Sequence, residues 1–217
     1  RVSPDGKHVY VASEASDAVA VFARDAVTGL LSFVEAATNG VAGVAGLDGA
    51  RELALSPDGA TLYAAGFVDS AIAVFSRDSA SGALVFEEAL MDGVGGADGL
   101  GGVTSLLVRG DGRRVYATAQ SEDAIGVFAR DPATGALAFL DAIRAECGAR
   151  SLDGATRIAA SPNGRHFYVA SWLDDAIAIF APEPGGAAAV LAALLALAGL
   201  GRRPGRATRG CVVARRR

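Results

Sequence analysis

The chain repeats one pattern of apolar and polar positions, with successive copies 53, 53 and 52 residues apart. Each copy begins with the turn Ser-Pro-Asp-Gly or a variant of it, at residues 3–6, 56–59, 109–112 and 161–164. Short apolar runs rich in Val, Ala, Ile and aromatic residues follow this turn and are separated by turn residues. Such runs are typical of β-strands joined by hairpins. The copies lack a 3.6-residue periodicity, which excludes a helical repeat fold.

Three apolar runs recur in phase after the turn. The first covers residues 8–12, 61–65, 114–118 and 166–170, and the second covers 18–22, 71–75, 124–128 and 176–180. An Arg-Asp pair and a Thr-Gly or Ser-Gly turn precede a third run at 30–36, 84–90 and 137–143. A further run before the next Ser-Pro-Asp-Gly turn, such as 52–55 or 105–108, makes four strands per copy. Tandem four-stranded units predict an all-β fold, in which residues 1–181 form about four blades of a β-propeller.

Both ends of the repeat region are incomplete. Arg1 aligns with Ala54, so the first copy lacks most of its opening strand, and the fourth copy stops after the run that ends at Phe180. We therefore expect an incomplete ring whose N-terminal part is missing, so that the blades form an open arc or a strained small ring and not a well-closed propeller. The fourth strand of the last blade has two readings: a segment upstream of this chain supplies it, or it is absent.

Composition limits the classes of protein and of partner. Hydrophobic residues make up 51% of the 217 residues, which is enough for a folded core and too many for a disordered chain. The chain has 20 basic and 24 acidic residues, and seven of the arginines follow position 201, where there is no acidic residue. The rest of the chain is therefore acidic, with 13 basic and 24 acidic residues, and we expect no nucleic-acid partner.

The repeats resemble the bacterial lactonase-like family of seven-bladed β-propellers, which includes 6-phosphogluconolactonase and a muconate-cyclising enzyme. The resemblance covers residues 1–181 and rests on the Ser-Pro-Asp-Gly turn, Val-Tyr-Val-Ala-Ser at 9–13, Asp-Ala-Val-Ala-Val-Phe at 17–22, and the Arg-Asp and Thr-Gly-Leu motifs that follow. It implies a full ring of seven blades, which at this repeat length needs about 370 residues. Surface-protein repeats share the same turn, so the resemblance implies the fold more strongly than an enzymatic activity.

The resemblance also implies two candidate catalytic residues. In the family's enzymes a Pro-Arg-His element opens one inner strand, and an Asn-Glu pair follows the next strand. Here Ala50-Arg51-Glu52 matches the first element through Arg51, and Ser13-Glu14 matches the second through Glu14, while the His is absent. Lactone hydrolysis needs a base and a polarising group near one acyl carbon. Because Arg51 and Glu14 belong to different repeats, we expect them to lie apart and this chain to hold no complete active site.

Acidic residues recur between the second and third strand of each repeat and are candidate metal ligands. In one reading, Asp17, Asp69, Asp123 and Asp175 form a negative ring on one rim, which could hold a hard cation such as Ca²⁺. In the other reading, which we favour, each Asp is a turn residue of its hairpin. We expect no other cofactor.

Residues 182–217 differ sharply in composition from the repeats. They consist of the motif Pro182-Glu183-Pro184-Gly185, an uncharged Ala- and Leu-rich run at 186–201 and an Arg-rich end at 202–217. This order resembles the PEP-CTERM sorting signal of exported proteins of Gram-negative bacteria. The uninterrupted Ala-Leu run favours a helix, which the resemblance implies is a transient membrane anchor. A buried Ala-rich helix is the alternative, and the basic end is longer than is usual for the signal.

Together these features predict an exported β-propeller module that binds or scaffolds at the cell surface or in the extracellular matrix of a Gram-negative bacterium. Its expected partners are an exosortase-type processing enzyme, which would cleave near the Pro-Glu-Pro motif, and a polysaccharide or protein ligand at the envelope. The alternative is a lactonase-type hydrolase, similar to 6-phosphogluconolactonase, that acts on a sugar or acid lactone.

Overall fold

The computed structural model describes residues 1–144, 152–182 and 190–195, which form strands and turns and contain no helix. The strands make four antiparallel sheets, one for each repeat. The first sheet contains β1 (His8–Ser13), β2 (Ala18–Arg24) and β3 (Leu31–Thr38), and the second contains β4 (Ala50–Leu55), β5 (Thr61–Gly66), β6 (Ala71–Arg77) and β7 (Leu84–Met91). The third contains β8 (Val103–Val108), β9 (Arg114–Ala119), β10 (Ala124–Arg130) and β11 (Leu137–Arg144), and the fourth contains β12 (Ala155–Ala160), β13 (Phe167–Ser171), β14 (Ala176–Pro182) and β15 (Val190–Leu195). The predicted all-β repeat of four-stranded sheets is confirmed for these residues.

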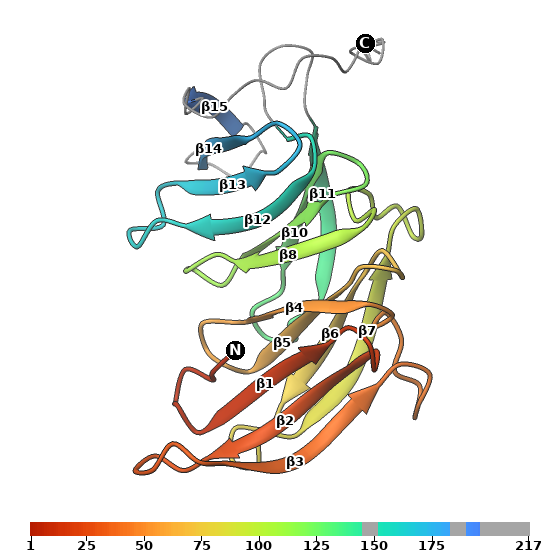
Figure 1. The fold of residues 1–217 in the computed structure, drawn as a ribbon, viewed down its shortest axis with the longest axis vertical. Coiled ribbons are helices and arrows are strands. Elements are labelled where there is room, and N and C mark those ends of the chain that lie inside the picture. Colours follow the sequence, from red (N-terminus) through yellow and green to blue (C-terminus); the bar gives the residue numbers. More distant parts are fainter. Residues whose placement is uncertain (145–151, 183–189, 196–217) are drawn as a thin grey trace.

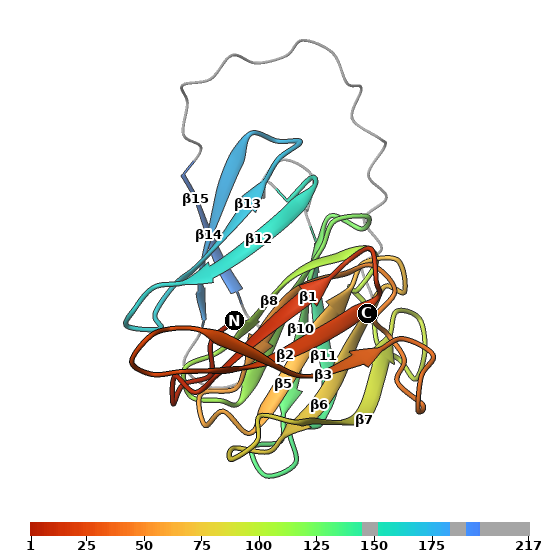
Figure 2. The same cartoon turned by 60° about the horizontal axis from the view of Figure 1, so that its bottom comes forward.

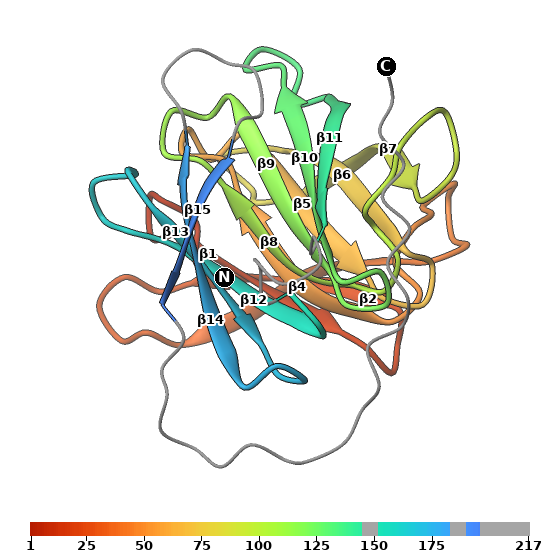
Figure 3. The same cartoon turned by 90° about the horizontal axis from the view of Figure 1, so that it is seen from above.

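The sheets are arranged like consecutive blades of a propeller. They succeed one another along the long axis of the molecule, from β1–β3 at one end to β12–β15 at the other (Figure 1). In Figure 2 the fourth sheet fans out from the other three and meets the third sheet through its inner strand β12. The innermost strands pack in the order β4, β8 and β12, and β1 packs against β4 (Figure 3). The first sheet has no complete inner strand, since before β1 only Val2 pairs with it, opposite Val9.

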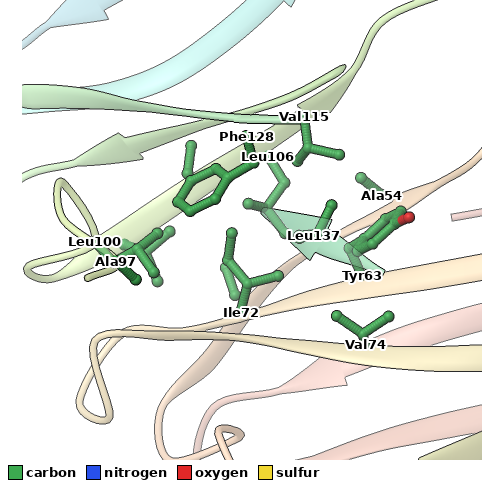
Figure 4. Close-up of a cluster of buried hydrophobic side chains, with 13 residues drawn as sticks. Ala54, Tyr63, Ile72, Val74, Ala97, Leu100, Leu106, Val115, Phe128 and Leu137 are labelled. Carbon is green, nitrogen blue, oxygen red and sulfur yellow. The ribbon is translucent and has the colours of Figure 1, made fainter. Parts of the chain in front are cut away.

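The hydrophobic core lies between neighbouring sheets. Between the second and third sheets, Tyr63, Ile72 and Val74 meet Leu106 and Phe128 (Figure 4). Similar clusters join the first sheet to the second and the third to the fourth. Because the second and third sheets are covered on both faces, β6 is buried at five successive positions, and its apolar run does not alternate. The fourth sheet is covered on one face, so β13 alternates between buried and exposed side chains.

A buried arginine joins the second sheet to the first. Arg77, at the end of β6, donates from Nε to the hydroxyl of Tyr10 at 2.6 Å and from Nη1 to the carbonyl of Gly59 at 3.1 Å. Its Nη2 lies 3.1 Å from Asp5 Oδ2 and 2.9 Å from His8 Nδ1. Burial and the nearby guanidinium lower the pKa of His8, so its ring is neutral near pH 7 and Nδ1 can accept this hydrogen bond.

The same contact joins the third sheet to the second. Arg130, at the end of β10, donates to the hydroxyl of Tyr63 at 2.7 Å, to the carbonyl of Gly112 at 3.0 Å and to Thr61 Oγ1 at 3.0 Å. Its Nη2 also lies 3.5 Å from Asp58. We call this arrangement the arginine latch: the arginine of one sheet, held by the tyrosine and the Ser-Pro-Asp-Gly turn of the preceding sheet. It explains why these three motifs recur together in the sequence.

The helix predicted over residues 186–201 is wrong where the structure describes this range. Val190–Leu195 form β15, which pairs with β14 from Ile177 to Pro182. The outer edge of β14 offers a row of backbone N–H and C=O groups, and pairing satisfies them. Helix preferences differ by only about 0.7 kcal/mol per residue among ordinary residues, so this pairing outweighs the preference of Ala and Leu for helix. The fourth strand of the last sheet therefore comes from the chain downstream, which neither reading of the sequence anticipated.

The remaining predictions for the tail fall largely outside the described residues. Pro182 is the last residue of β14, while Glu183 and Pro184 of the expected sorting motif, and residues 186–189 and 196–217, lie beyond the described ranges. Within those ranges, no helix has the length and apolar character needed to cross a membrane. Export, exosortase processing and anchoring stay predictions.

Candidate functional site

A cleft of about 380 Å³ opens at the rim of the arc where the inner strands begin. Its polar lining comes from two kinds of position. One is the residue that follows the strand next to the inner strand in each repeat, and the other is the first few residues of an inner strand. These are Glu14 and Gln120, after β1 and β9, and Arg51, Thr104, Thr156 and Arg157, on β4, β8 and β12. All four sheets therefore contribute to one site, as the geometry of a propeller axis requires.

A β-bulge at the start of each inner strand directs side chains into this cleft. On β4, Ala50 pairs with Gly66 and Glu52 with Ala65, so Arg51 is an extra residue without a partner on β5. The same register shift leaves Thr104 on β8 and Thr156 on β12 without a partner on the neighbouring strand. A bulge bends its strand and re-aims the side chain of the extra residue. The repeated bulge thus places positions 51, 104 and 156 around one end of the axis.

Arg51 and Glu14 form an ion pair at the mouth of the cleft. Nη2 of Arg51 lies 2.6 Å from Glu14 Oε1, and Nε lies 3.0 Å from the same oxygen. The guanidinium also stacks on Phe67, with Cζ 3.6 Å from the centre of the ring. Both hydrogen bonds fall on Oε1, so within the described part of the chain Oε2 of Glu14 and Nη1 of Arg51 are free to bind a ligand or a water molecule.

The expectation that Arg51 and Glu14 lie apart is therefore wrong. Strands β1 and β3 end at the same rim, and the connector after β3 leads from there directly to the start of β4. Glu14 and Arg51 are 37 residues apart in sequence but adjacent in space. The repeat assignment separated them, whereas the packing of neighbouring sheets brings them together.

A second pair of opposite charges, which the sequence analysis did not single out, lies beside the first. Glu52 accepts a hydrogen bond from Nη2 of Arg1 at 2.7 Å and another from Nη1 of Arg157. Its carboxylate is largely buried, with 12% of the side chain exposed. Glu52 and Arg157 occupy the same repeat position on β4 and β12. The sequence did contain a signal for this ion pair: equivalent positions on the inner strands converge on the axis, and one such position carries Glu in one repeat and Arg in another.

Three of the four candidate calcium ligands accept hydrogen bonds from the backbone of a connector. Asp17 and Asp123 each accept a hydrogen bond of 2.9 Å from the backbone N–H of a glycine in the following connector. Asp69 accepts one of 3.0 Å from the N–H of Asp48. Asp17, Asp123 and Asp175 have positive φ angles of 48°, 53° and 49°, as tight-turn residues do. Within the described part of the chain these carboxylates do not gather at metal-ligand distance. Calcium binding at these positions stays a prediction.

The acidic residues that do gather are Asp92, Asp98 and Glu122, whose oxygens lie within 4.8 Å of one another. Arg144, at the end of β11, donates from Nη2 to Asp98 at 2.5 Å and to Glu122 at 3.2 Å. This contact lowers the pKa of Asp98, whereas burial and the neighbouring Asp92 raise the pKa of Glu122. The cluster is an ion-pair network that ties the connector to the third sheet.

Comparison with known proteins places this geometry in a family. The family model described as a lactonase with a seven-bladed β-propeller matches residues 1–97 and 44–182. Among solved structures, a protein from Lactobacillus plantarum is similar with a TM-score of 0.72 and 24% identity, over 90% of this chain and 52% of its own. A candidate 6-phosphogluconolactonase from Bacteroides uniformis has a TM-score of 0.71 and 22% identity, over 88% and 52% of the two chains.

A periplasmic gluconolactonase from Pseudomonas aeruginosa is similar with a TM-score of 0.68 and 25% identity, over 90% of this chain and 53% of its own. No curated protein sequence matches significantly. The chain thus spans about half the length of these solved relatives. The match of the family model to the whole repeat region, together with the four blade-like sheets, leads to one conclusion: the chain belongs to the lactonase family of seven-bladed β-propellers.

Proposed function

We propose that this protein is a lactone hydrolase and that the cleft at Arg51 and Glu14 binds the lactone of a polyhydroxy acid. The observation that carries the proposal is the ion pair itself: a carboxylate and a guanidinium from different sheets meet at 2.6 Å in the cleft. Membership of the lactonase family supports the reaction class, and the gluconolactonase from Pseudomonas aeruginosa supports the substrate class. This reading replaces the binding module as the leading hypothesis.

The two side chains have complementary roles in this proposal. Oε2 of Glu14 accepts a proton from a water molecule, and the resulting hydroxide adds to the lactone carbonyl carbon. Nη1 of Arg51 donates a hydrogen bond to the oxyanion that forms, while its ion pair with Glu14 keeps the guanidinium in place. The tetrahedral intermediate then breaks the ring C–O bond, and the leaving alkoxide takes the proton from Glu14. One water is consumed and one hydroxy acid is formed.

The lining of the cleft suits a small polyhydroxylated ligand. Thr104 and Thr156 provide hydroxyl groups, and Gln120 provides an amide that both donates and accepts. A volume of about 380 Å³ is at the lower end of the range for ligand sites. The polar groups outnumber the apolar ones, which favours a sugar acid over an apolar ester.

We expect Arg51→Ala to lower kcat/KM for gluconolactone about tenfold or more, because the oxyanion loses a donor and Glu14 loses its orienting partner. Glu14→Gln should cause a comparable loss, since an amide cannot take the proton from water. Hydrolysis is followed by titrating the acid produced. Arg165→Ala serves as the control, because Arg165 is exposed on the turn at the opposite rim. Hydrolysis that survives both cleft substitutions would contradict the proposal.

Binding without hydrolysis would favour the second candidate, a surface-directed module that binds a polysaccharide. The observation behind it is Trp172, at the repeat position of Glu14 and Gln120, which is 59% exposed on the same rim. It is the single tryptophan of the chain, so its fluorescence reports directly on that rim. A fluorescence change with neutral oligosaccharides, and no acid release from gluconolactone, would select this candidate over the hydrolase.

A further inference from the structure

The two arginine latches differ at one position, the residue that opens the strand after the turn. In the first latch, Nη2 of Arg77 donates to Nδ1 of His8 at 2.9 Å. In the second latch, Nη2 of Arg130 donates to Oγ1 of Thr61 at 3.0 Å. His8 and Thr61 are equally buried, each with 3% of its surface exposed. A threonine hydroxyl accepts a hydrogen bond at any pH, whereas an imidazole nitrogen accepts one only while it carries no proton.

The surroundings of His8 leave no place for an added proton. The guanidinium of Arg77 keeps its charge and can only donate, so a proton on Nδ1 of His8 would set two donors against each other. The ring also lies against Gly82 of the second sheet, where an added Cβ atom would overlap it. Close packing and a fixed cation therefore both favour the neutral ring.

The charges that face His8 come from the turn before β1 and from the end of β6. Asp5 and Lys7 belong to the turn, and Arg77 and Asp78 belong to the second sheet. Burial and the guanidinium of Arg77 have the largest effects, and together with Lys7 they outweigh the two carboxylates and lower the pKa of His8. In the folded protein His8 therefore takes up its proton at a lower pH than in the unfolded chain.

Strand β1 connects this latch with the candidate functional site. His8 is the first residue of β1, and Glu14 directly follows its last residue, at the other rim. Between them the hydroxyl of Tyr10 accepts a hydrogen bond from Nε of Arg77 at 2.6 Å. The first sheet is thus held on the second at both ends of β1, by the latch at one rim and by the ion pair of Glu14 with Arg51 at the other.

We propose that the first arginine latch is a pH-sensitive joint, which holds Glu14 against Arg51 while His8 is neutral and releases the first sheet when His8 is protonated. A protonated ring cannot accept a hydrogen bond from Arg77, so the two cations separate and β1 moves away from β6. The second latch, built on Thr61, stays closed at the same pH. The release of the sheet follows from the latch alone, and its effect on lactone hydrolysis rests on the proposed function.

The direction of the pH dependence follows from proton linkage. The pKa of a histidine is about 6.5 in an unfolded chain, and that of His8 is lower in the folded protein. Between the two values the unfolded chain binds more protons, so the stability that depends on neutral His8 is complete above about pH 6.5 and is lost as the pH falls. The carboxylates of both latches, Asp5 and Asp58, have lowered pKa values and lose their effect only near about pH 4. The two pH ranges are therefore separate.

The test compares the pH dependence of stability in the 217-residue chain and in His8→Thr, which copies the second latch. Urea unfolding is followed by circular dichroism between about pH 7.5 and about pH 5, above the range of the latch carboxylates. Relative to His8→Thr, the unfolding equilibrium constant of the wild type should rise by up to about tenfold per pH unit below about pH 6.5. The other titrating groups are common to both chains and cancel in the comparison. His166→Thr, at an exposed histidine of the same repeat position, is the control and should keep the pH dependence of the wild type.

Two further measurements do not depend on the folding of His8→Thr. The His166→Thr chain retains His8 as its single histidine, so its NMR titration gives the pKa of His8 directly, and we expect a value below 6.5. Hydrogen exchange of the wild type, corrected for the intrinsic rate at each pH, should show that β1 loses protection on acidification while β10 keeps it.

A pKa of His8 at or above 6.5 would overturn the inference. So would a folded His8→Thr chain with the pH dependence of the wild type, or an equal loss of protection in β1 and β10. None of these measurements uses a lactone. A chain that passes them and hydrolyses no lactone would disprove the proposed function and leave the joint in place.

Discussion

Arg130→Ala is expected to lower the free energy of unfolding by about 3 kcal/mol, the scale on which breaking a buried charge network destabilises a protein. Only 1% of its side chain is exposed, and its three nitrogens all donate hydrogen bonds, Nε and Nη2 to the second sheet and Nη1 to the carbonyl of Gly112 in its own sheet. Removing it leaves the carbonyl of Gly112 and the hydroxyl oxygen of Tyr63 without a donor in a space closed to water. The packing of the aliphatic part of the side chain is lost as well.

The control for this prediction is a substitution at the same repeat position. Arg24→Ala removes an arginine whose hydrogen bond within the described part of the chain, to the carbonyl of Gly6, lies in its own sheet, so for this 217-residue chain we expect a loss of about 0.5 kcal/mol or less. Urea unfolding followed by circular dichroism, at concentrations where the chain is monomeric, measures both. Equal losses for the two variants would mean that the contribution of Arg130 arises within its own sheet, and the arginine latch would then have no energetic role between sheets.

The latch also shows where sequence analysis succeeds and where it stops. The Ser-Pro-Asp-Gly turn, the tyrosine and the Arg-Asp pair were visible as recurring motifs, and they correctly placed turns and strand ends. The contact that the three motifs form together could not be predicted from the sequence, because Arg77 and Asp5 are 72 residues apart and meet only when one sheet packs on the next. A periodic sequence predicts what is local to each repeat, whereas the contacts between repeats depend on how the units stack.

For the candidate site, too, the sequence indicated the residues but not the contact between them. Family resemblance named Arg51 and Glu14, but their contact depends on a bulge in β4 and on the rim shared by two sheets, and neither leaves a pattern of apolar and polar residues. In the tail, by contrast, the sequence predicted the wrong element, because an Ala- and Leu-rich run favours a helix when it is considered alone. In the structure Val190–Leu195 adopt the conformation that the free edge of β14 selects. Local preference decides only where no stronger tertiary partner is available.

The third sheet also approaches the second closely at Gly135, where we expect Gly135→Ala to destabilise the chain by about 3 kcal/mol. Two effects contribute to this value. Gly135 has a φ of 79°, and an L-residue in that left-handed conformation costs about 1 kcal/mol. The new methyl group would also overlap Thr61 Oγ1 and stand 2.7 Å from its Cγ2, and displacing a packed neighbour costs about 2 kcal/mol more.

Gly29→Ala separates the two effects, because Gly29 has almost the same φ, 75°, and open space around its Cβ position. It should cost about 1 kcal/mol, from the backbone alone. The difference between the two variants, read from the midpoints of urea unfolding at equal slope, is then the cost of pushing one sheet away from the next.

Thr61 also accepts a hydrogen bond from Arg130, so displacing Thr61 disturbs the arginine latch. The double variant Gly135→Ala with Arg130→Ala should therefore lose less stability than the sum of the two single variants. Strict additivity of the double variant would show that the methyl group is accommodated without moving Thr61, and that the two sheets are less tightly joined than the structure indicates.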